Sequence, residues 1–412
     1  MSVATAPPAS PKITKGSLEE GVSPSPSVTP PSPVSFNVQV LQHLEELQQH
    51  REAWQTLVRQ ALEPNPFFEP WFFEPAMRWL KPPPTLRIVL IYRHHPPHQP
   101  ELIAFYPLCQ LRWGRWPVTV WTNWQHPYHY YSAPLIHRHR AAEAWEQLWS
   151  WMTAQESAHA WELTGLCVDS SWGNLLRDWQ FRHQPRALLV EQHQRAIFYN
   201  IPPHDTPWYA TMSKHTKHEL ERLRRRLNEK AALQVLSSDR EPFAPTDDFL
   251  QLEAQGWKGR EGTAIARDPQ HAAFFQEMTH RGLATGRVHW LGLQHAQRLV
   301  ALKLNFVTPP HSFAFKIAYD ETLSKYSPGT LLECDNITWL RQHSELSWMD
   351  SCAKPGHPMI ERLWHDRRVV QHWLFPLGPG IHECLLSCHP LWASLKGWWA
   401  SWKSCESKTF PR

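Results

Sequence analysis

The sequence lacks the hallmarks of several common protein classes. No window is apolar for long enough to cross a bilayer, and the N-terminus lacks the charged-then-apolar order of a secretory signal. The seven cysteines are odd in number and spread over 412 residues, so they do not form a disulfide framework. We therefore expect a protein of a reducing compartment, and the cytoplasm fits these absences.

The sequence also lacks motifs for covalent catalysis and for structural metal binding. No Ser-His-Asp or nucleophilic Cys constellation follows from residue spacing, which agrees with direct group transfer. The densest group of metal-ligand types, HEC (residues 382–384) with CH (388–389), lacks the long loop that usually separates the ligand pairs of a zinc site. We expect no metal.

Composition divides the chain into four parts. Residues 1–35 are rich in proline, serine and threonine, which predicts a disordered tail. Residues 36–200 and 201–380 each alternate between helical and strand patterns, as two α/β halves with a mixed sheet would. Residues 381–412 form a tryptophan-rich tail. The length suits this division, because a chain of 412 residues can bury two cores.

The first half shows a regular order of elements and echoes the second. We expect a helix over residues 40–62, strands over 85–92, 101–109 and 118–121, a helix over 141–153, a strand over 161–166 and a helix over 172–181. Residues 101–105 resemble residues 298–302. Asp169-Ser170 and Asp350-Ser351 then follow in the same relative place. Two echoes in the same order predict an internal duplication.

Residues 299–350 carry the most local information. Two apolar runs, 299–307 and 312–319, flank Pro309-Pro310, which predicts a hairpin. SPGT (residues 327–330) then predicts a helix start, because Ser327 can cap a helix and proline suits its first position. Residues 346–350 return as a strand. The free amides and positive dipole of the helix start would form a cradle for a phosphate, although most such starts bind nothing.

A second candidate group is WKGREGT (residues 257–263). Its glycines let backbone amides approach a ligand, and Lys258 and Arg260 supply charge for a phosphate or a carboxylate. Trp257 would form an aromatic wall. Glycine-rich basic turns are also common without any function, and this alternative stays open.

The net charge of +4 is concentrated in residues 213–230, which contain seven Lys or Arg and three Glu. Leu220, Leu223 and Leu227 form a narrow apolar stripe, so one interpretation is a solvated helix docked by these leucines. A nucleic-acid helix is less favoured, because the segment has no aromatic interleaving. The third interpretation is a helix that faces a phosphate.

Four blocks of the second half resemble the acyltransferase domain of the CelD-like proteins, named for cellulose biosynthesis. These proteins belong to the GNAT superfamily and are related to the Fem-type peptidoglycan transferases. The blocks are GWKGREGTA (residues 256–264), RLVALKLNF (298–306), AFKIAYDETLSKYSPGTLL (314–332) and MDSCAKPGHPMIERLW (349–364).

The resemblance implies tandem GNAT-like halves joined by a basic helix, with the active site in the second half and a degenerate first half that shapes the acceptor cleft. It implies acyl-CoA, such as acetyl-CoA, as the donor and an amine on a small molecule or glycan as the acceptor. If strand 312–319 splays from strand 346–350, unpaired amides would face the acyl group. The residues implied for the donor are Ile317, Ala318, Tyr319, Ser327, Gly329 and Thr330. Those implied for the acceptor are Lys214, Lys217, Arg222, Trp257, Lys258, Arg260, Trp364 and Arg367.

Transfer to an amine also needs a path for the proton that the amine loses. Asp320 and Asp350 stand at the two strand ends that border the expected gap, although each is equally an ordinary strand-end residue. Many relatives end the last block with Lys, two residues and Trp, where this chain has ERLW (residues 361–364). An oxyanion role of that lysine would pass to Lys354, Arg362 or Arg367, or be lost. Glu361 could instead act as a base.

The C-terminal tail has an amphipathic pattern. Its apolar residues Leu391, Trp392, Leu395, Trp398, Trp399 and Trp402 fall on one side of a helix. The stripe either packs on the domain or a partner subunit, or lies in a membrane interface, since tryptophan prefers the headgroup boundary. The second interpretation gives residues 391–404 a peripheral contact with the inner face of the membrane, which suits envelope or exopolysaccharide biosynthesis.

Two alternatives stand beside an acyl-CoA-dependent acyltransferase. One is a Fem-type transferase that takes its donor from aminoacyl-tRNA, which would make tRNA the single nucleic-acid partner. The other is a catalytically inactive subunit that binds acyl-CoA or a polysaccharide precursor.

Overall fold

The structure is a computed structural model, and it describes residues 33–112, 118–155, 157–183, 187–202, 207–210 and 212–377. Most of the predicted disordered tail and all of the tryptophan-rich tail therefore lie outside the described residues. Within the described residues, no helix is both long enough and apolar enough to cross a membrane.

The first half is an α/β unit. Its strands are β1 (Ser35–Leu41), β2 (Arg87–His94), β3 (Glu101–Arg112), β4 (Thr119–Asn123), β5 (Leu135–Ile136), β6 (Ala160–Cys167) and β7 (Leu188–Tyr199). Its helices are α1 (Leu44–Gln48), α2 (Arg51–Gln60), η1 (Pro66–Phe68), α3 (Pro70–Trp79), α4 (Ala141–Thr153) and α5 (Ser171–His183). The predicted helix start at residue 40 was wrong, because residues 35–41 pair with β2 as a strand. Their alternation of polar and apolar residues has the period of a strand.

The second half begins with the basic helix. Its helices are α6 (Lys214–Asn228), α7 (Thr246–Gln255), α8 (Trp257–Arg260), η2 (Ile265–Arg267), α9 (Pro269–Ala284), η3 (Glu321–Tyr326), α10 (Pro328–Gln342) and α11 (Pro358–Leu363). Its strands are β8 (Leu233–Ser237), β9 (Val288–His295), β10 (Arg298–Thr308), β11 (His311–Tyr319), β12 (Trp348–Asp350) and β13 (Asp366–Pro376). The predicted hairpin and the helix start after residue 327 are both confirmed.

All strands of the described residues join one mixed sheet in the order β1-β2-β3-β4-β6-β13-β7-β12-β11-β10-β9-β8, with β5 beside β3. The parallel pairs are β4 with β6 and β11 with β12. Read from either edge, the sheet shows the same succession of antiparallel and parallel pairs, with the parallel pair in fourth place. The two sequence echoes fall on equivalent places. β3 and β10 are each the third strand from an edge. Asp169 follows β6, Asp350 ends β12, and β6 and β12 are the inner strands of the two parallel pairs. The internal duplication is confirmed.

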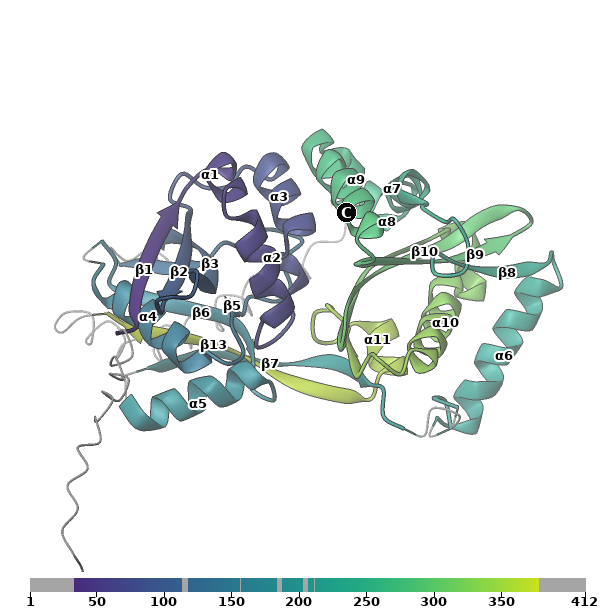
Figure 1. The fold of residues 1–412 in the computed structure, drawn as a ribbon. Coiled ribbons are helices and arrows are strands. Elements are labelled where there is room, and N and C mark those ends of the chain that lie inside the picture. Colours follow the sequence, from purple (N-terminus) through teal and green to yellow (C-terminus); the bar gives the residue numbers. More distant parts are fainter. Residues whose placement is uncertain are drawn as a thin grey trace, which may run out of the picture.

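The two halves exchange a strand. β7 belongs to the first half of the chain but pairs with β12, and β13 belongs to the second half but pairs with β6. β7 and β13 also pair with each other along most of their length, and Figure 1 shows them running side by side between the halves. The division at residues 200 and 201 stays a prediction, and this exchange means that each half is completed by the other.

The halves also share a core on one face of the sheet. In Figure 1, α7 and α9 lie on one face of the second-half sheet and α10 and α11 on the other, and both views place α3 beside α9. Glu74 of α3 accepts a hydrogen bond from Arg281 of α9 at 2.6 Å. Phe67 and Phe72 of the first half pack on Phe306 of β10 at ring distances of 5.8 and 5.7 Å. First-half aromatic residues therefore lie directly on the second-half sheet.

The basic helix is docked on the second half. Ser213 caps it by accepting a hydrogen bond from the Thr216 amide at 3.1 Å, and Leu223 and Leu227 are buried in a core with α10. Arg224 binds Asp335 of α10 at 2.7 Å. The predicted docking through the leucine stripe is confirmed.

Candidate active site

The pairing between β11 and β12 ends early. The two strands run parallel from His311 opposite Trp348 to Phe313 opposite Asp350, while β11 continues to Tyr319. On its other edge, β11 stays paired with β10 as far as Tyr319. Residues 314–319 therefore present an edge of backbone amides and carbonyls that no described strand covers. β12 is paired along its whole length, so the open edge arises because β12 ends at Asp350, and the expected splay of the two strands stays a prediction.

Helix α10 begins at the far end of this open edge. Pro328 occupies its first position, and the Leu331 amide makes the first helical hydrogen bond, to the Ser327 carbonyl at 3.0 Å. The amides before Leu331 thus lie ahead of the helical ladder, at the positive end of the helix dipole. Gly329 packs closely on β11, because a Cβ at this position would lie 2.9 Å from the Tyr319 ring. The open edge and the helix start are therefore adjacent.

The expected cap by Ser327 was wrong. Its side chain makes no capping hydrogen bond, and its backbone is left-handed with φ of 52°. This conformation ends the preceding turn η3 and leads directly into Pro328. Gly329 and half-buried Thr330 remain the residues whose amides lead the helix.

A β-bulge redirects Lys316. The register with β10 shifts between Leu304 opposite Lys316 and Asn305 opposite Ala314, which leaves Phe315 as the extra residue. Phe315 and Lys316 consequently both face the first half, where Tyr130 contacts each of them. A lysine is thereby aimed between the halves from the middle of an apolar strand.

Aromatic rings surround the Lys316 ammonium group. Its Nζ donates to the Tyr130 hydroxyl at 3.0 Å and lies 5.3, 5.6 and 5.6 Å from the ring centres of Tyr128, Tyr130 and Phe315. Burial lowers the pKa of Lys316, and the negative charge of Glu253 opposes that shift. The rings and the hydroxyl stabilise the charged form. Because both tyrosines follow β4, the first half supplies part of the site.

Lys316 lines a cavity of about 640 Å³ between the halves. Its other polar lining comes mostly from α7 to α9 and includes Glu253, Lys258, Arg267, Asp268 and His271. A small pocket beside β11 shares Glu253 and Lys258 with this cavity. The small pocket at the open edge of β11 and the cavity are therefore neighbours, and the cavity has room for a second molecule.

The structure gathers several predicted residues at this place. Ile317, Ala318 and Tyr319, predicted for the donor, line the small pocket together with Trp257 and Lys258, predicted for the acceptor. Segments about sixty residues apart in the sequence meet because α7 and α8 pack beside β11.

The predicted cations of the WKGREGT segment are bound by protein carboxylates. This segment is not an open turn, because its first residues form helix α8. Lys258 lies 2.6 Å from Glu253, and Arg260 lies 2.6 Å from Glu321. Glu321 also accepts from the Trp257 amide at 2.6 Å, and the Trp257 side chain is 47% exposed. Lys258 and Arg260 therefore hold α8 in place, and a clamp role would require these pairs to open.

The three predicted catalytic carboxylates lie far apart along the site. Asp350 is fully buried opposite Phe313, at the point where the pairing of β11 with β12 ends. Asp320 lies at the wide end and accepts from the Thr322 amide at 2.9 Å. Exposed Glu361 binds Arg367, which holds the pKa of that carboxyl below its usual value and weakens it as a base.

Asp350 belongs to a charged group on the seam between the halves. Its carboxylate lies 3.7 Å from Arg195 of β7 and 3.5 Å from Arg368 of β13, and these two arginines are direct cross-strand neighbours. Arg368 also binds Asp169, the equivalent residue of the first half, at 3.4 Å. This symmetrical arrangement compensates buried charges and holds the exchanged strands together.

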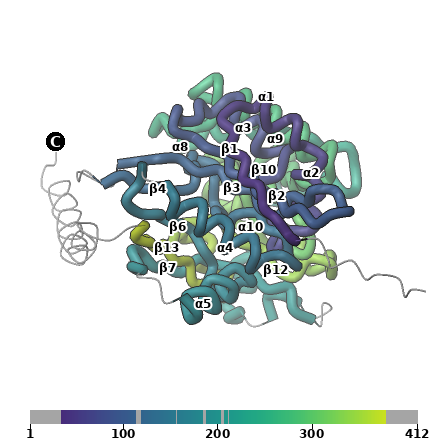
Figure 2. The backbone as a smooth tube through the Cα atoms, turned by 60° about the vertical axis from the view of Figure 1, so that its left-hand side comes forward, coloured from purple at the N-terminus to yellow at the C-terminus, as the bar shows by residue number. Residues whose placement is uncertain are grey.

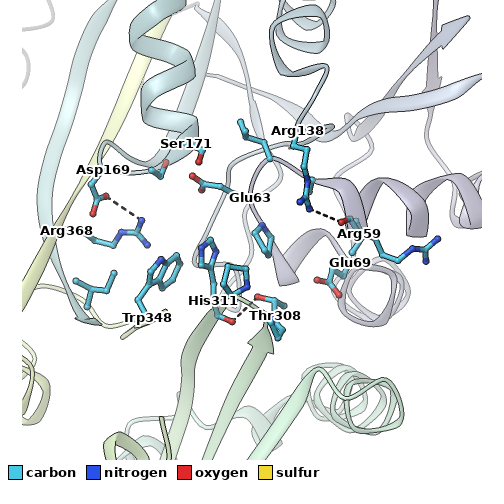
Figure 3. Close-up of a pocket in the computed structure, with 18 of the residues that line it drawn as sticks. Arg59, Glu63, Glu69, Arg138, Asp169, Ser171, Thr308, His311, Trp348 and Arg368 are labelled. Atoms are coloured by element: carbon cyan, nitrogen blue, oxygen red, sulfur yellow. Dashed lines mark hydrogen bonds and ion pairs between the residues drawn. The ribbon is translucent and has the colours of Figure 1, made fainter. Parts of the chain in front are cut away.

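A second cleft, of about 680 Å³, lies beside this charged group (Figure 3). The rings of His311 and Trp348 stack with their centres 4.0 Å apart, and the guanidinium group of Arg368 lies 4.6 Å from the centre of the same Trp348 ring. This cleft adjoins the end of β11 that is still paired with β12, so the strand edge there is closed. The open edge lies at the other cavity, and we place the candidate site there.

The remaining predicted acceptor residues do not converge on the cavity. Trp364 is fully buried in the core under α10, so its assignment to a binding pocket was wrong. Arg367 binds Glu361 and donates to the Trp364 carbonyl at 2.6 Å. Lys217 donates to the carbonyl of Ala210 at 2.9 Å. Lys214 and Arg222 are exposed on α6.

Sequence reasoning missed the polar residues that line the cavity. Lys316 had a visible signal, since it is a single lysine in the apolar run FAFKIAY. Glu253 had none, because it appears as an ordinary helix carboxylate. Tyr128 and Tyr130 lie in the other half, and only the packing of the halves brings them to β11.

Within the described residues, one group of metal-ligand types comes together outside this site. Glu191 and His193 of β7 and His372 of β13 place their ligand atoms within 4.8 Å of one another. Glu191 and His193 already form a hydrogen bond at 3.2 Å. The HEC and CH residues near the C-terminus lie outside the described residues.

A family model matches part of the second half. Residues 214–355 match the model described as an acetyltransferase (GNAT) domain. The matched range contains the open edge of β11, the start of α10 and Lys316. This part of the second half is similar to a GNAT acetyltransferase domain. A search of curated proteins gives no match.

One of the solved structures that resemble this chain has a TM-score above 0.5 and shows a similar fold. The crystal structure of FemX matches with a TM-score of 0.52 and 10% identity, over 85% of this chain and 99% of that one. A conserved protein of unknown function from Bacteroides thetaiotaomicron VPI-5482 matches with a TM-score of 0.49 and 9% identity, over 80% and 97%. A tandem GNAT protein from the clavulanic acid biosynthesis pathway matches with a TM-score of 0.40 and 12% identity, over 84% and 100%. The likeness to FemX concerns the fold alone, and the CelD-like type stays a prediction.

Proposed function

We propose that this GNAT-like protein is an acyltransferase that moves an acyl group from acyl-CoA to an amine, with its active site in the second half. The observation that carries this proposal is the open edge of β11 beyond Phe313, which leads to the start of α10. A strand edge and a helix start in this order suit a long donor with phosphates at one end and a reactive carbonyl at the other.

The residues present fit acyl-CoA. The amides at the start of α10 suit its phosphates, and Gly329 keeps that start close to β11. The edge at Ile317 to Tyr319 can hydrogen-bond its amide groups. When bound, acyl-CoA supplies an activated thioester.

Direct transfer forms a C–N bond and breaks the C–S bond, so CoA leaves as its thiolate and the amine loses a proton. Amides of the β11 edge can bind the carbonyl oxygen as negative charge develops on it. The cavity at Lys316 places the amine beside that edge and reduces the entropic cost of the encounter. The proton reaches the thiolate or the solvent through the open side of the cavity.

A Fem-type transferase with an aminoacyl-tRNA donor is the second candidate, favoured by the cations of α6. Lys214, Arg222 and Arg226 are all exposed on this helix. A tRNA donor would give binding that weakens steeply with salt and with removal of these charges. A catalytically inactive subunit would bind CoA without releasing thiol from acetyl-CoA.

A place in envelope or exopolysaccharide biosynthesis, at the inner face of the membrane, belongs to the same proposal. Residues 391–404, which would make the membrane contact, lie outside the described residues. Full-length protein should sediment with anionic vesicles, and protein truncated after Pro390 should remain in solution. Equal sedimentation of both would remove this part of the proposal.

The donor site is tested by titrating CoA into the full-length protein in a calorimeter. Thr330→Glu places a carboxylate where the phosphates are expected, while a negative charge at a helix start preserves the helix. Thr330→Gln is the matched neutral control. We expect the Kd for CoA to rise about tenfold or more in Thr330→Glu relative to Thr330→Gln. Equal CoA affinities of the two variants would overturn the donor site.

A further inference from the structure

We propose that the cavity beside β11 takes an acceptor that carries an anionic group, a carboxylate or a phosphate, in addition to its amine, and that Lys316 binds this anion. The amine rests on the proposed function. The anion site follows from the cavity itself and can be tested separately.

The carboxylates of the cavity are already engaged by the protein. Glu253 lies 2.6 Å from Lys258 and accepts from the Ile265 amide at 2.9 Å, so both of its oxygens are used. Asp268 caps α9 and accepts from the amides of Gln270 and His271. Neither carboxylate contacts Lys316.

Two cations of the cavity have no such partner. Within the described part of the chain, neither Lys316 nor Arg267 forms an ion pair, and the hydrogen-bond partner of Lys316 is the neutral Tyr130 hydroxyl. The cavity lining contains three cations, Lys258, Arg267 and Lys316, and two carboxylates, Glu253 and Asp268, so it carries one net positive charge. An anionic ligand would compensate this charge in a partly buried place, where an ion pair is stronger than in bulk water.

The fold holds Lys316 in position for such a ligand. The bulge at Phe315 directs the side chain into the cavity, and the rings of Tyr128 and Tyr130 limit its movement. The Tyr128 hydroxyl is itself hydrogen-bonded to His271 at 3.1 Å. A lysine held in this way loses little conformational freedom when it binds an anion. By contrast, Arg368 in the other cleft is already paired with Asp169 and Asp350.

The test uses amines in matched pairs that differ in one anionic group. Saturation-transfer NMR with the full-length protein would compare glucosamine 6-phosphate with glucosamine, and 6-aminohexanoate with hexylamine. We expect the anionic member of at least one pair to bind about tenfold more tightly than its neutral partner. Inorganic phosphate should compete with it.

Three variants assign the effect to Lys316. Lys316→Met should remove the preference for the anionic member, and Lys316→Arg should keep most of it, because arginine also binds carboxylates and phosphates. Lys230→Met, which removes an exposed lysine after α6, should leave it unchanged. The inference is overturned if the anionic members do not bind, if both members bind alike, or if Lys316→Met keeps the preference.

Calorimetry with CoA separates this inference from the proposed function. Lys316→Met should bind CoA like the unchanged protein, because the lysine faces the cavity and not the helix start. A preference for anionic amines without any CoA binding would keep the anion site and reject the acyl-CoA donor. CoA binding without a preference for anionic amines would reject the anion site and keep the acyl-CoA donor.

Discussion

The two halves share a strand order but differ in what lies beyond the parallel strand pair. In the second half, β11 extends past β12 and leaves an open edge. In the first half, β4 and β6 stop pairing at Thr122 opposite Glu162, and side chains fill the next space. Asn123 donates to Ser132 at 3.0 Å, and Gln125 donates to Thr164 at 2.9 Å. Thr164 also hydrogen-bonds Asn123. Protein groups therefore occupy the place that stays open in the second half.

The loops after these strands differ in the same way. The segment after β11 leads through η3 into Pro328 and Gly329 at the start of α10. The segment after β4 instead carries Tyr128 and Tyr130 across to Lys316 in the other half. The second half has an open strand edge at this place, and the first half uses the equivalent loop to line the neighbouring cavity.

The largest effect is expected from a buried ion pair of the second half that the first half lacks at the corresponding position. Lys303 lies 2.8 Å from Glu333, with exposed fractions of 3% and 0%. Lys303 directly follows the echoed segment 298–302, and the residue that directly follows its counterpart 101–105 is buried Tyr106. Lys303→Met should lower the free energy of unfolding by about 3–5 kcal/mol, because it leaves a buried carboxylate unpaired.

Urea unfolding would measure this loss in the full-length protein. The double variant Lys303→Met with Glu333→Leu should recover most of it, since the uncompensated charge is then gone. A double variant as unstable as the single one would mean that the pair has another role.

The next effect concerns the contact between the helix start and β11. Gly329→Ala should cost about 1–3 kcal/mol of stability and weaken CoA binding, because the new methyl group meets Tyr319 at 2.9 Å. Gly286→Ala is the control, since Gly286 has φ of +66° and no atom within 4 Å of the new Cβ. It should cost about 1–2 kcal/mol through backbone strain and leave CoA affinity unchanged. Unfolding curves and calorimetry would compare the two variants.

A pH effect should come from both halves. Burial lowers the pKa of His129 to about 4 and that of His311 to about 3, whereas unfolded histidine titrates near 6.5. The unfolded chain therefore binds more protons between these values, so this contribution is complete above about pH 6.5 and decreases as the pH falls. As the pH falls from about 6.5 to about 5, protonation of each histidine in the unfolded chain should lower the free energy of unfolding by about 1–2 kcal/mol.

Unfolding at both pH values would test this for the unchanged protein and for His129→Gln and His311→Gln. Each variant should lose the part of the pH dependence that the substituted histidine contributes. If one variant keeps the full dependence, the histidine of that half is not held in its neutral form.

The smallest effect is expected in the filled space of the first half. Gln125→Ala removes an exposed donor to Thr164 and should cost about 0.5–1.5 kcal/mol. CoA affinity should not change, because the proposed donor edge belongs to β11. A clear loss of CoA affinity in this variant would show that the first half takes part in donor binding.

Local sequence patterns determined much of the second half. The hairpin of β10 and β11 follows from two apolar runs around Pro309-Pro310, and α10 begins at Pro328 because proline suits a first helical turn. The stripe of Leu223 and Leu227 correctly placed one face of α6 on a core. These features depend on residues close together in the chain, so their short-range preferences are sufficient to predict them.

The tertiary structure decided which charges are available and where they point. Lys258 and Arg260 were expected to face a ligand, but Glu253 and Glu321 bind them. Lys316 looked like an interruption of an apolar strand, and a one-residue register shift against β10 aims it at tyrosines of the other half. An ion pair, a bulge and an exchanged strand each depend on groups remote in sequence, whose distances are set by packing and not by any local pattern.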